Sequence, residues 1–248
     1  MSAMTLQLTM AALTNKGRVR NNNEDSMYAD VADRVAIVCD GMGGHAGGHI
    51  ASELAVQYIS SALRQLKPQE WLDEEKVIEA MKLATFGAND TILVRALEDV
   101  ELADMGTTLV ACAFMHDRVI TANVGDSRIY RIVDDTLEQI SSDHSLVAER
   151  VRAGLLDPES DEAAMLANII TRALGMEQIT VDITVEELQP GDIYLLCSDG
   201  LCDMLTDEEI LRTVVRARSL DNACLALVDQ ANRNGGIDNI TVALIRAD

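Results

Sequence analysis

The alternation of apolar and polar positions along the chain predicts short strands, several of them joined by hairpins. A continuous apolar run at 35–39 is typical of a buried strand. Two further runs flank the turn His116-Asp117, which indicates a hairpin. The full set of predicted strands is 35–39, 107–115, 119–124, 128–133, 179–185, 193–197 and 240–245.

Helical spacing of apolar residues follows the first predicted strand, from Ala51 to Leu66. A second helix begins after Asp73, because Glu74 and Glu75 then occupy a first turn, where the helix dipole favours negative charge. A third helix is expected between the last two predicted strands, and its apolar positions include Ile210, Val214, Leu225 and Val228.

The order of these elements predicts an α+β fold. Hairpin-joined strands with helices inserted in pairs favour antiparallel sheets covered by helices over a doubly wound parallel sheet. The stretch 145–174 is interrupted by Gly154 and Pro158, and we expect it to be helical or irregular. No Pro/Gly/Ser-rich linker, repeat or low-complexity tract divides the sequence, so we expect a single domain over residues 1–248.

Composition restricts what this fold can bind. Hydrophobic residues make up 48% of the chain but aromatic residues only 3%, so the core must consist mainly of Ala, Val, Ile, Leu and Met. Asp and Glu number 41 against 20 Lys and Arg, which gives a net charge of -21. Such a field opposes binding to nucleic acid or to an anionic membrane. A phosphate group could bind only where local cations offset the repulsion.

The cysteines and the N-terminal segment indicate a soluble cytoplasmic protein. Five cysteines, an odd number without a CxxC pair, lie mostly in apolar runs, so we expect buried thiols rather than disulfides or zinc ligands. The segment MSAMTLQLTM lacks the charged and apolar regions of a signal peptide. No apolar run approaches the ~18 residues that a membrane span needs.

Four carboxylates stand at the ends of apolar strands. Asp40 follows AIVC, Asp199 follows YLLCS, Asp126 follows ITANVG, and Asp238 precedes NITVALI. Burying an unpaired carboxylate costs roughly several kcal/mol, which a bound cation would relieve. Oxygen ligands without His or Cys suit Mg²⁺ or Mn²⁺ rather than zinc, and two such ions can share and activate a water. Four ordinary turn aspartates remain an open alternative.

Two other segments are candidate parts of the same site as these carboxylates. In RVRNNNEDS, which is too polar to be core, the Arg20 guanidinium could bind two phosphate oxygens, and Glu24 and Asp25 could hold a metal or its water. An exposed charged loop explains the same residues. The run CDGMGGHAGG is either a slack connector or a place where backbone approaches something closely.

Eight segments occur in an order that identifies a family: RVRNNNED, VCDGMGGHAGG, MGTT, NVGDSRIY, DHSL, NIITRALG, CSDGL and DNIT. From about Ala11 to Ile245 the chain resembles the metal-dependent protein phosphatases (PPM, type 2C) in their bacterial form. The resemblance implies an α-β-β-α sandwich, in which two central antiparallel β-sheets are flanked by helices on both sides. It also implies that residues 148–173 form a flap beside the active site.

The resemblance assigns roles to the candidate residues. It makes Asp40 the bridge between two metal ions and the carbonyl of Gly41 a ligand of one of them. The remaining glycines would let the chain turn tightly beneath the metals. The other implied roles are Asp199 and Asp238 on the first metal, Glu24 and Asp25 on the second metal partly through water, Asp126 on a third metal, and Arg20 on the substrate phosphate.

One position departs from the animal members of the family. They carry a His, assigned as the acid that protonates the leaving group, where this chain has Met42. Bacterial relatives share the Met, so the resemblance still implies activity. A thioether donates no proton, so we expect a metal-bound water to do so. His45 is an alternative donor by its proximity in sequence, although we expect it instead to support the glycine turn, and we expect His144 to be structural.

The resemblance therefore implies a Mg²⁺- or Mn²⁺-dependent protein serine/threonine phosphatase. A hydroxide bridging the metals would attack phosphorus in line, without a phosphoenzyme. The expected substrates are proteins phosphorylated by a bacterial serine/threonine kinase, and we expect a monomer. A nucleotide-binding protein is the first alternative, but CDGMGGHAGGH has neither a GK[ST] ending nor GxGxxG spacing. A catalytically silent phosphoprotein-binding regulator is the second, although such a chain would be expected to have lost metal ligands.

Overall fold

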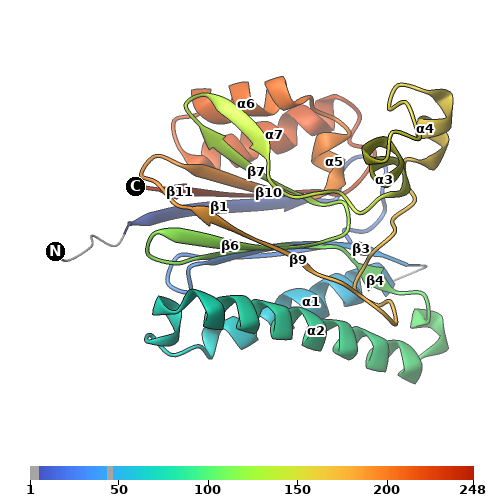
Figure 1. Ribbon diagram of the computed structural model, residues 1–248. Coiled ribbons are helices and arrows are strands. Elements are labelled where there is room, and N and C mark those ends of the chain that lie inside the picture. The colour runs from blue at the N-terminus through green and yellow to red at the C-terminus, as the bar shows by residue number, and fades with distance from the viewer. Residues whose placement is uncertain (1–5, 44–46) are drawn as a thin grey trace.

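The computed structural model describes residues 6–43 and 47–248. Two β-sheets pack face to face, with helices α1 and α2 on one outer surface and α6 and α7 on the other (Figure 1). Each strand pairs antiparallel with its neighbours. The expected α-β-β-α sandwich of the α+β class is confirmed.

The two sheets contain five and six strands. The first sheet runs in the order β1 (Leu8–Asn15), β11 (Ile240–Ala247), β10 (Ile193–Cys197), β7 (Arg128–Val133) and β8 (Thr136–Gln139). The second runs in the order β2 (Asp25–Asp30), β3 (Val35–Met42), β5 (Leu109–Phe114), β6 (Arg118–Val124) and β9 (Asp182–Glu187), and β4 (Gly106–Thr107) pairs with β3.

The helices divide into two covering pairs and a group near one end of the sandwich (Figure 1). The covering helices are α1 (Gly47–Arg64), α2 (Glu74–Glu98), α6 (Asp207–Arg216) and α7 (Leu220–Arg233). The group near one end consists of α3 (Leu146–Arg152), α4 (Asp161–Leu166) and α5 (Asp199–Cys202). Two 3-10 turns, Glu70–Leu72 and Val100–Leu102, precede and follow α2. Asp73 caps α2 as predicted, since its side chain accepts a hydrogen bond from the Lys76 amide. Among the described helices, none is long and apolar enough to span a membrane.

The core forms three layers because each sheet has two covered faces. Apolar side chains of α1 and α2 pack on the second sheet, and those of α6 and α7 pack on the first. Between the sheets, Phe114 meets Tyr194 edge to face, with ring centroids 5.5 Å apart. With so few aromatic residues, this central pair accounts for two of the largest fully buried side chains.

The strand predictions succeed where both faces of a strand are buried. Strands lie at 35–39, 128–133, 193–197 and 240–245, and the predicted strand 179–185 is shifted to Asp182–Glu187. The sequence pattern missed β1, β2 and β8, which carry alternating or mostly polar residues instead of apolar runs. All three lie at sheet edges.

The single helix expected between 193–197 and 240–245 is wrong, because α5, α6 and α7 occupy this stretch. Thr206 and Glu209 form a reciprocal capping box that begins α6. Ala217 is extended, with ψ at 146°, and ends that helix. The Ser219 side chain then accepts a hydrogen bond from the Asn222 amide and begins α7.

Candidate active site and metal centre

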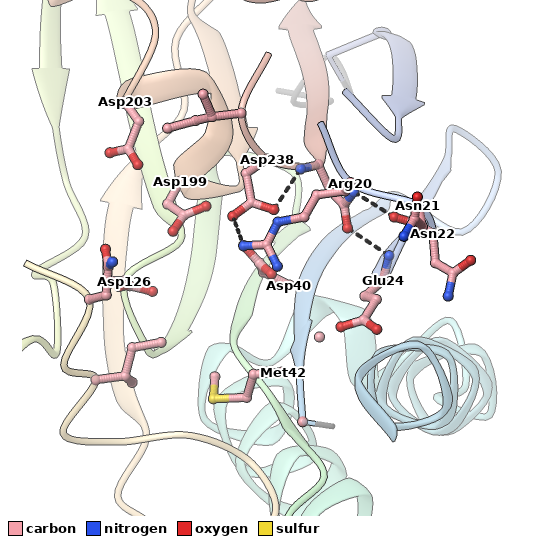
Figure 2. Close-up of a pocket in the computed structure, with 16 residues that line it drawn as sticks. Arg20, Asn21, Asn22, Glu24, Asp40, Met42, Asp126, Asp199, Asp203 and Asp238 are labelled. Carbon is pink, nitrogen blue, oxygen red and sulfur yellow. Dashed lines mark hydrogen bonds and ion pairs between the residues drawn. The ribbon is translucent and has the colours of Figure 1, made fainter. Parts of the chain in front are cut away.

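The predicted site residues gather around one pocket of about 560 Å³, at the end of the sandwich where α5 and the flap helices lie (Figure 1). Figure 2 shows Asp126, Asp199 and Asp203 on one side and Glu24 on the other. The predicted residues that line the pocket are Arg20, Glu24, Asp40, Gly41, Asp126, Asp199 and Asp238. Asp25 is the predicted site residue that does not line it.

Asp40 is held at the end of β3 by two threonines of the MGTT segment. Its backbone amide donates to the Thr108 hydroxyl over 2.9 Å, and its carbonyl accepts from the Thr107 hydroxyl over 2.9 Å. Thr108 is fixed in turn by a 2.7 Å hydrogen bond with Ser127. Both threonines are buried, so they position the backbone of Asp40 and leave its carboxylate free to face the pocket.

The carboxylates of the pocket raise one another's pKa. Burial, followed by the charges of Asp25 and Asp199, raises the pKa of Asp40 well above its ordinary value. Burial and the charge of Asp203 raise the pKa of Asp199 to about 6, while burial and Asp199 raise that of Asp126 to about 7. The cluster therefore favours anything positive that enters it, whether a proton or a metal ion.

Asp25 lies below the pocket, on β2 directly opposite Asp40 in the strand register. Its Oδ2 accepts hydrogen bonds from Ser198 over 2.8 Å and from Thr241 over 2.6 Å. Burial raises its pKa to about 7. The prediction that RVRNNNEDS is too polar to be core is therefore wrong at Asp25, which is buried because hydroxyl groups from β11 and from the segment after β10 replace water around it.

Arg20 forms an ion pair with a predicted metal ligand. Its Nη2 lies 2.6 Å from Oδ2 of Asp238, and its side chain is more than half exposed. Oδ1 of Asp238 accepts from the Asn239 amide over 2.8 Å. Among the described residues that line the pocket, Arg20 is the one cationic side chain, and it neutralises the carboxylate nearest to it (Figure 2).

The glycine run is a place of close backbone approach. A Cβ added to Gly41 would overlap the carbonyl group of Gly48, and one added to Gly48 would overlap the carboxylate of Glu24. Gly43 has a φ of +134°, which side chains rarely tolerate. The interpretation as a slack connector is thus wrong for the described part of the run, because the start of α1 packs directly beneath Asp40 and Glu24. His45, the alternative proton donor, lies outside the described residues.

The donor set fits a divalent ion of the Mg²⁺ or Mn²⁺ type. It consists of carboxylate oxygens and the Gly41 carbonyl, and hard cations prefer such oxygen ligands. Oδ1 of Asp25 and Oδ1 of Asp199 are buried without a hydrogen-bond partner in the part of the chain that the structure describes. Within residues 6–43 and 47–248, no three His, Cys, Asp or Glu side chains already form a ligand cluster. Asp238 is engaged with Arg20 instead, so the ligand set must close around an entering ion.

The sequence did not predict several residues that support the site. Asn239 accepts from the Glu24 amide over 2.7 Å and donates to the carbonyls of Lys16 and Asn22 over 3.0 and 2.9 Å. It thereby ties the loop that carries Arg20 to the strand that follows Asp238. The signal was present in DNIT, where the Asn directly follows the predicted ligand. Other pocket residues without a predicted role are Asn21, Asn22, Asn168, Ile170, Asp203 and Ile237.

His144 is structural, as expected. It is almost fully buried, its Nδ1 accepts from the Gly125 amide over 3.1 Å, and its Nε2 lies 3.1 Å from Asp182. Burial lowers its pKa. His144 therefore holds the turn that presents Asp126 and takes no part in proton transfer at the pocket. Met42 does line the pocket, with a side chain that cannot donate a proton.

A second cavity of about 360 Å³ lies under the flap and shares Asp126, Asn168, Asp199 and Asp203 with the first pocket. Its other lining residues come from the flap, from the segment that precedes the flap, and from β7 and α5. These residues are Arg128, Asp143, Ser145, Val147, Ala148, Val151, Pro158, Ala167 and Cys202. The flap segment therefore borders a cavity that adjoins the predicted metal site.

Comparisons with known proteins agree with this geometry. The sequence pattern described as Protein phosphatase 2C matches residues 16–229. A serine/threonine phosphatase, stp, of Listeria monocytogenes is 38% identical over 239 residues, which cover 95% of this chain and 94% of the relative. The crystal structure of the Mycobacterium tuberculosis serine/threonine phosphatase PstP/Ppp has a TM-score of 0.89 and 34% identity, and covers 97% of this chain and 99% of that one.

A second solved structure holds metal. The catalytic domain of PstP in complex with two manganese ions has a TM-score of 0.87 and 36% identity, and covers 98% of this chain and 100% of that one. The family pattern spans most of the chain, and the match to the Listeria monocytogenes relative covers 94% of that relative. The chain belongs to the protein phosphatase 2C family of serine/threonine protein phosphatases.

Proposed function

We propose that residues 1–248 form one catalytic domain that hydrolyses phosphoserine and phosphothreonine in proteins with the help of divalent metal ions. The observation that carries this proposal is the cluster of strand-end carboxylates. Asp40, Asp126 and Asp199 meet in one pocket with raised pKa values, and Oδ1 of Asp199 lacks a partner among the described residues. Such a site is stable only around cations.

The core holds two ions, Mg²⁺ or Mn²⁺, as the PstP structure with two manganese ions supports. When bound, the ions activate a water toward phosphorus and offset the negative charge of the phosphoryl group. Asp40 would serve both ions, and the Gly41 carbonyl lies beside it at the end of β3. Asp199 and Asp238 would complete the first site, while Glu24 and the deeper Asp25 would serve the second, partly through water.

Arg20 binds the phosphate of the substrate. Its guanidinium lies at the mouth of the pocket, more than half exposed, in a position to exchange its contact with Asp238 for phosphate oxygens. A planar guanidinium donates two parallel hydrogen bonds to a phosphate group. Because the rest of the pocket is acidic, Arg20 also gives the incoming dianion its first favourable contact with a protein side chain.

Asp126 would hold a third divalent ion at the edge of the core site. The carboxylate lies on the side of the pocket that faces the flap cavity, near Asp199 (Figure 2). A site with so few protein ligands is loose, so it fills only at higher metal concentration. The leaving serine alkoxide needs a proton that the Met42 side chain cannot give, and we assign the support of this proton transfer to the Asp126 side of the pocket.

The substrates are proteins that a bacterial serine/threonine kinase has phosphorylated. The enzyme acts as a monomer in the cytoplasm. A charge of -21 disfavours nucleic acids and anionic membranes as partners. All five cysteines are free thiols, as expected in a reducing compartment. The flap, residues 148–173, borders both cavities and faces whatever polypeptide carries the phosphate.

The test is the hydrolysis of a phosphoserine peptide with Mn²⁺, with Mg²⁺ and with excess EDTA. We expect turnover with either metal, none in EDTA, and recovery when Mn²⁺ is added back. Asp199→Asn, with its fold verified by circular dichroism, is the matched control and should be inactive. Binding of the phosphopeptide without turnover under all conditions would instead indicate a catalytically silent regulator.

A further inference from the structure

Two thiols lie side by side next to the metal site. Cys197 ends β10 and Cys202 ends α5, and their sulfur atoms are 3.6 Å apart. The two residues bracket Asp199, so the chain between them carries a proposed metal ligand. Cys39 and Cys112 are buried in the other two layers of the core, and Cys224 is buried in the same layer as Cys197, where its sulfur lies 3.5 Å from the Ala11 carbonyl oxygen.

The two thiols differ in their access to solvent. Cys197 is fully buried and fixed in the sheet, where it pairs with Val242 on β11 and with Arg128 on β7. Cys202 is partly exposed and lines the cavity of about 360 Å³ under the flap. A small reagent that enters this cavity therefore meets the sulfur of Cys202 first, with the sulfur of Cys197 directly behind it.

The surroundings favour reaction at Cys202. Its sulfur lies 3.5 Å from the Tyr130 hydroxyl, which accepts a hydrogen bond from Nη1 of Arg128 over 3.1 Å. Positive charge close to a cysteine favours the thiolate, which is the nucleophilic form. Arg128 is itself held in position by its ion pair with Asp143, at 2.7 Å, although this carboxylate offsets part of its charge.

Little movement separates the thiols from a covalent bond. The sulfur atoms must approach by about 1.5 Å, from 3.6 Å to the ~2.05 Å of a disulfide. Since β10 is anchored by strands on both sides, the short helix α5 has to move. Asp199 begins that helix, and Ser198 before it donates to Asp25 and accepts from the Thr241 amide over 3.0 Å. Closing the bond thus pulls directly on the metal site.

We propose that Cys197 and Cys202 form an oxidative modification site, at which a peroxide converts the dithiol to a disulfide that displaces Asp199 and stops turnover. The Cys202 thiolate attacks one peroxide oxygen and breaks the O–O bond, which gives a sulfenic acid and a hydroxide; the hydroxide takes up the proton that the Cys202 thiol had lost and leaves as a first water. The Cys197 sulfur then attacks the Cys202 sulfur, the S–O bond breaks, and a second water leaves. Two thiols lose two electrons in total, and the peroxide gains them.

The experiment treats the full-length enzyme in Mg²⁺, which is not redox-active, with hydrogen peroxide and then with catalase. One half of each sample is alkylated and mapped by mass spectrometry under non-reducing conditions, and the other half is assayed on a phosphoserine peptide. We expect a peptide pair joined through Cys197 and Cys202, with a fall in turnover of about 10- to 100-fold, as expected when a catalytic group is displaced by about 1 Å. Dithiothreitol should reverse both changes, whereas it does not reduce a methionine sulfoxide at Met42.

Cys202→Ser tests the assignment, and Cys112→Ser is the matched thiol control. Cys202→Ser should keep its starting activity and resist peroxide, while Cys112→Ser should be inactivated like the wild type. Cys202→Ala replaces the serine variant if the latter folds poorly. If peroxide inactivated Cys202→Ser as strongly as the wild type, or inactivated the wild type without the mapped disulfide, the proposal would be overturned. A disulfide that forms without loss of turnover would overturn the proposed displacement of Asp199. The effect on turnover rests on the proposed function, but mapping detects the disulfide even if the reduced chain hydrolyses nothing.

Discussion

In the proposed function, the ion pair between Arg20 and Asp238 makes the substrate-binding residue compete with a metal ion for the same carboxylate. An exposed ion pair contributes at most about 1 kcal/mol, which corresponds to a factor of about five in an equilibrium constant. The Arg20 side chain is 57% exposed and that of Asp238 is 28% exposed, so this limit applies to them. Arg20→Ala should therefore leave Mn²⁺ affinity intact or tighten it by up to about fivefold.

The same substitution should weaken substrate binding more strongly. Hydrogen bonds to charged groups contribute about 1.5–3 kcal/mol, so their loss predicts a KM for a phosphopeptide that is about tenfold higher or more. Some loss of kcat is also expected, because the guanidinium faces charge that develops on the phosphoryl group. Arg20→Lys is the matched control, because it keeps the charge but loses the planar fork, and it should fall between wild type and Arg20→Ala.

Isothermal titration with Mn²⁺ and steady-state kinetics on a phosphoserine peptide measure the two effects separately. A large loss of Mn²⁺ affinity in Arg20→Ala would refute the reasoning, because it would mean that Arg20 organises the metal ligands instead of competing with the ion. Unchanged KM and kcat in Arg20→Ala would mean that Arg20 is a surface charge paired with Asp238 and does not bind the substrate.

The remaining predictions concern the carboxylates and one buried thiol. Asp40→Asn should abolish turnover while circular dichroism shows an intact fold, and retained turnover would contradict its role on both ions. Asp126→Ala should keep two tightly bound ions but lose more activity on a phosphopeptide than on p-nitrophenyl phosphate, whose leaving group needs little protonation. Because burial raises the pKa of Asp25 from 3.8 to about 7 in the folded chain, the metal-free protein should melt at lower temperature as pH rises through this window, and Mn²⁺ should suppress the trend. Cys39→Ser should cost roughly 1–3 kcal/mol of stability in urea unfolding, since it buries a hydroxyl, and should leave kcat unchanged.

The sequence predicted the fold best where the physical signal was local. Apolar runs identified β7, β10 and β11, which are buried on both faces. The edge strand β1 was missed because Thr residues interrupt its pattern and one face is only partly covered. The break between α6 and α7 does have a local signal in the sequence, the capping residue Ser219 at the start of α7.

The site was predictable as a set of residues but not as an arrangement. Asp40, Asp126, Asp199 and Asp238 could be selected because each stands where an apolar strand begins or ends. The burial of Asp25 could not, since it depends on hydroxyl groups far away in the sequence: Thr241 is 216 positions distant. The contact of Arg20 with Asp238 likewise joins residues 218 positions apart, and no spacing rule reaches so far.

These long separations in sequence affect when the active site can form during translation. Strand β11 pairs with β1 along its whole length and fills the place between β1 and β10 in the sheet. Asp238 and Asn239 stand immediately before β11, so the loop that carries Arg20 finds its partners only after residues 20–239 have all been synthesised. A nascent chain that already contains Arg20, Asp40 and Asp199 therefore still lacks part of the proposed metal site, and we expect no phosphatase activity until β11 is in place.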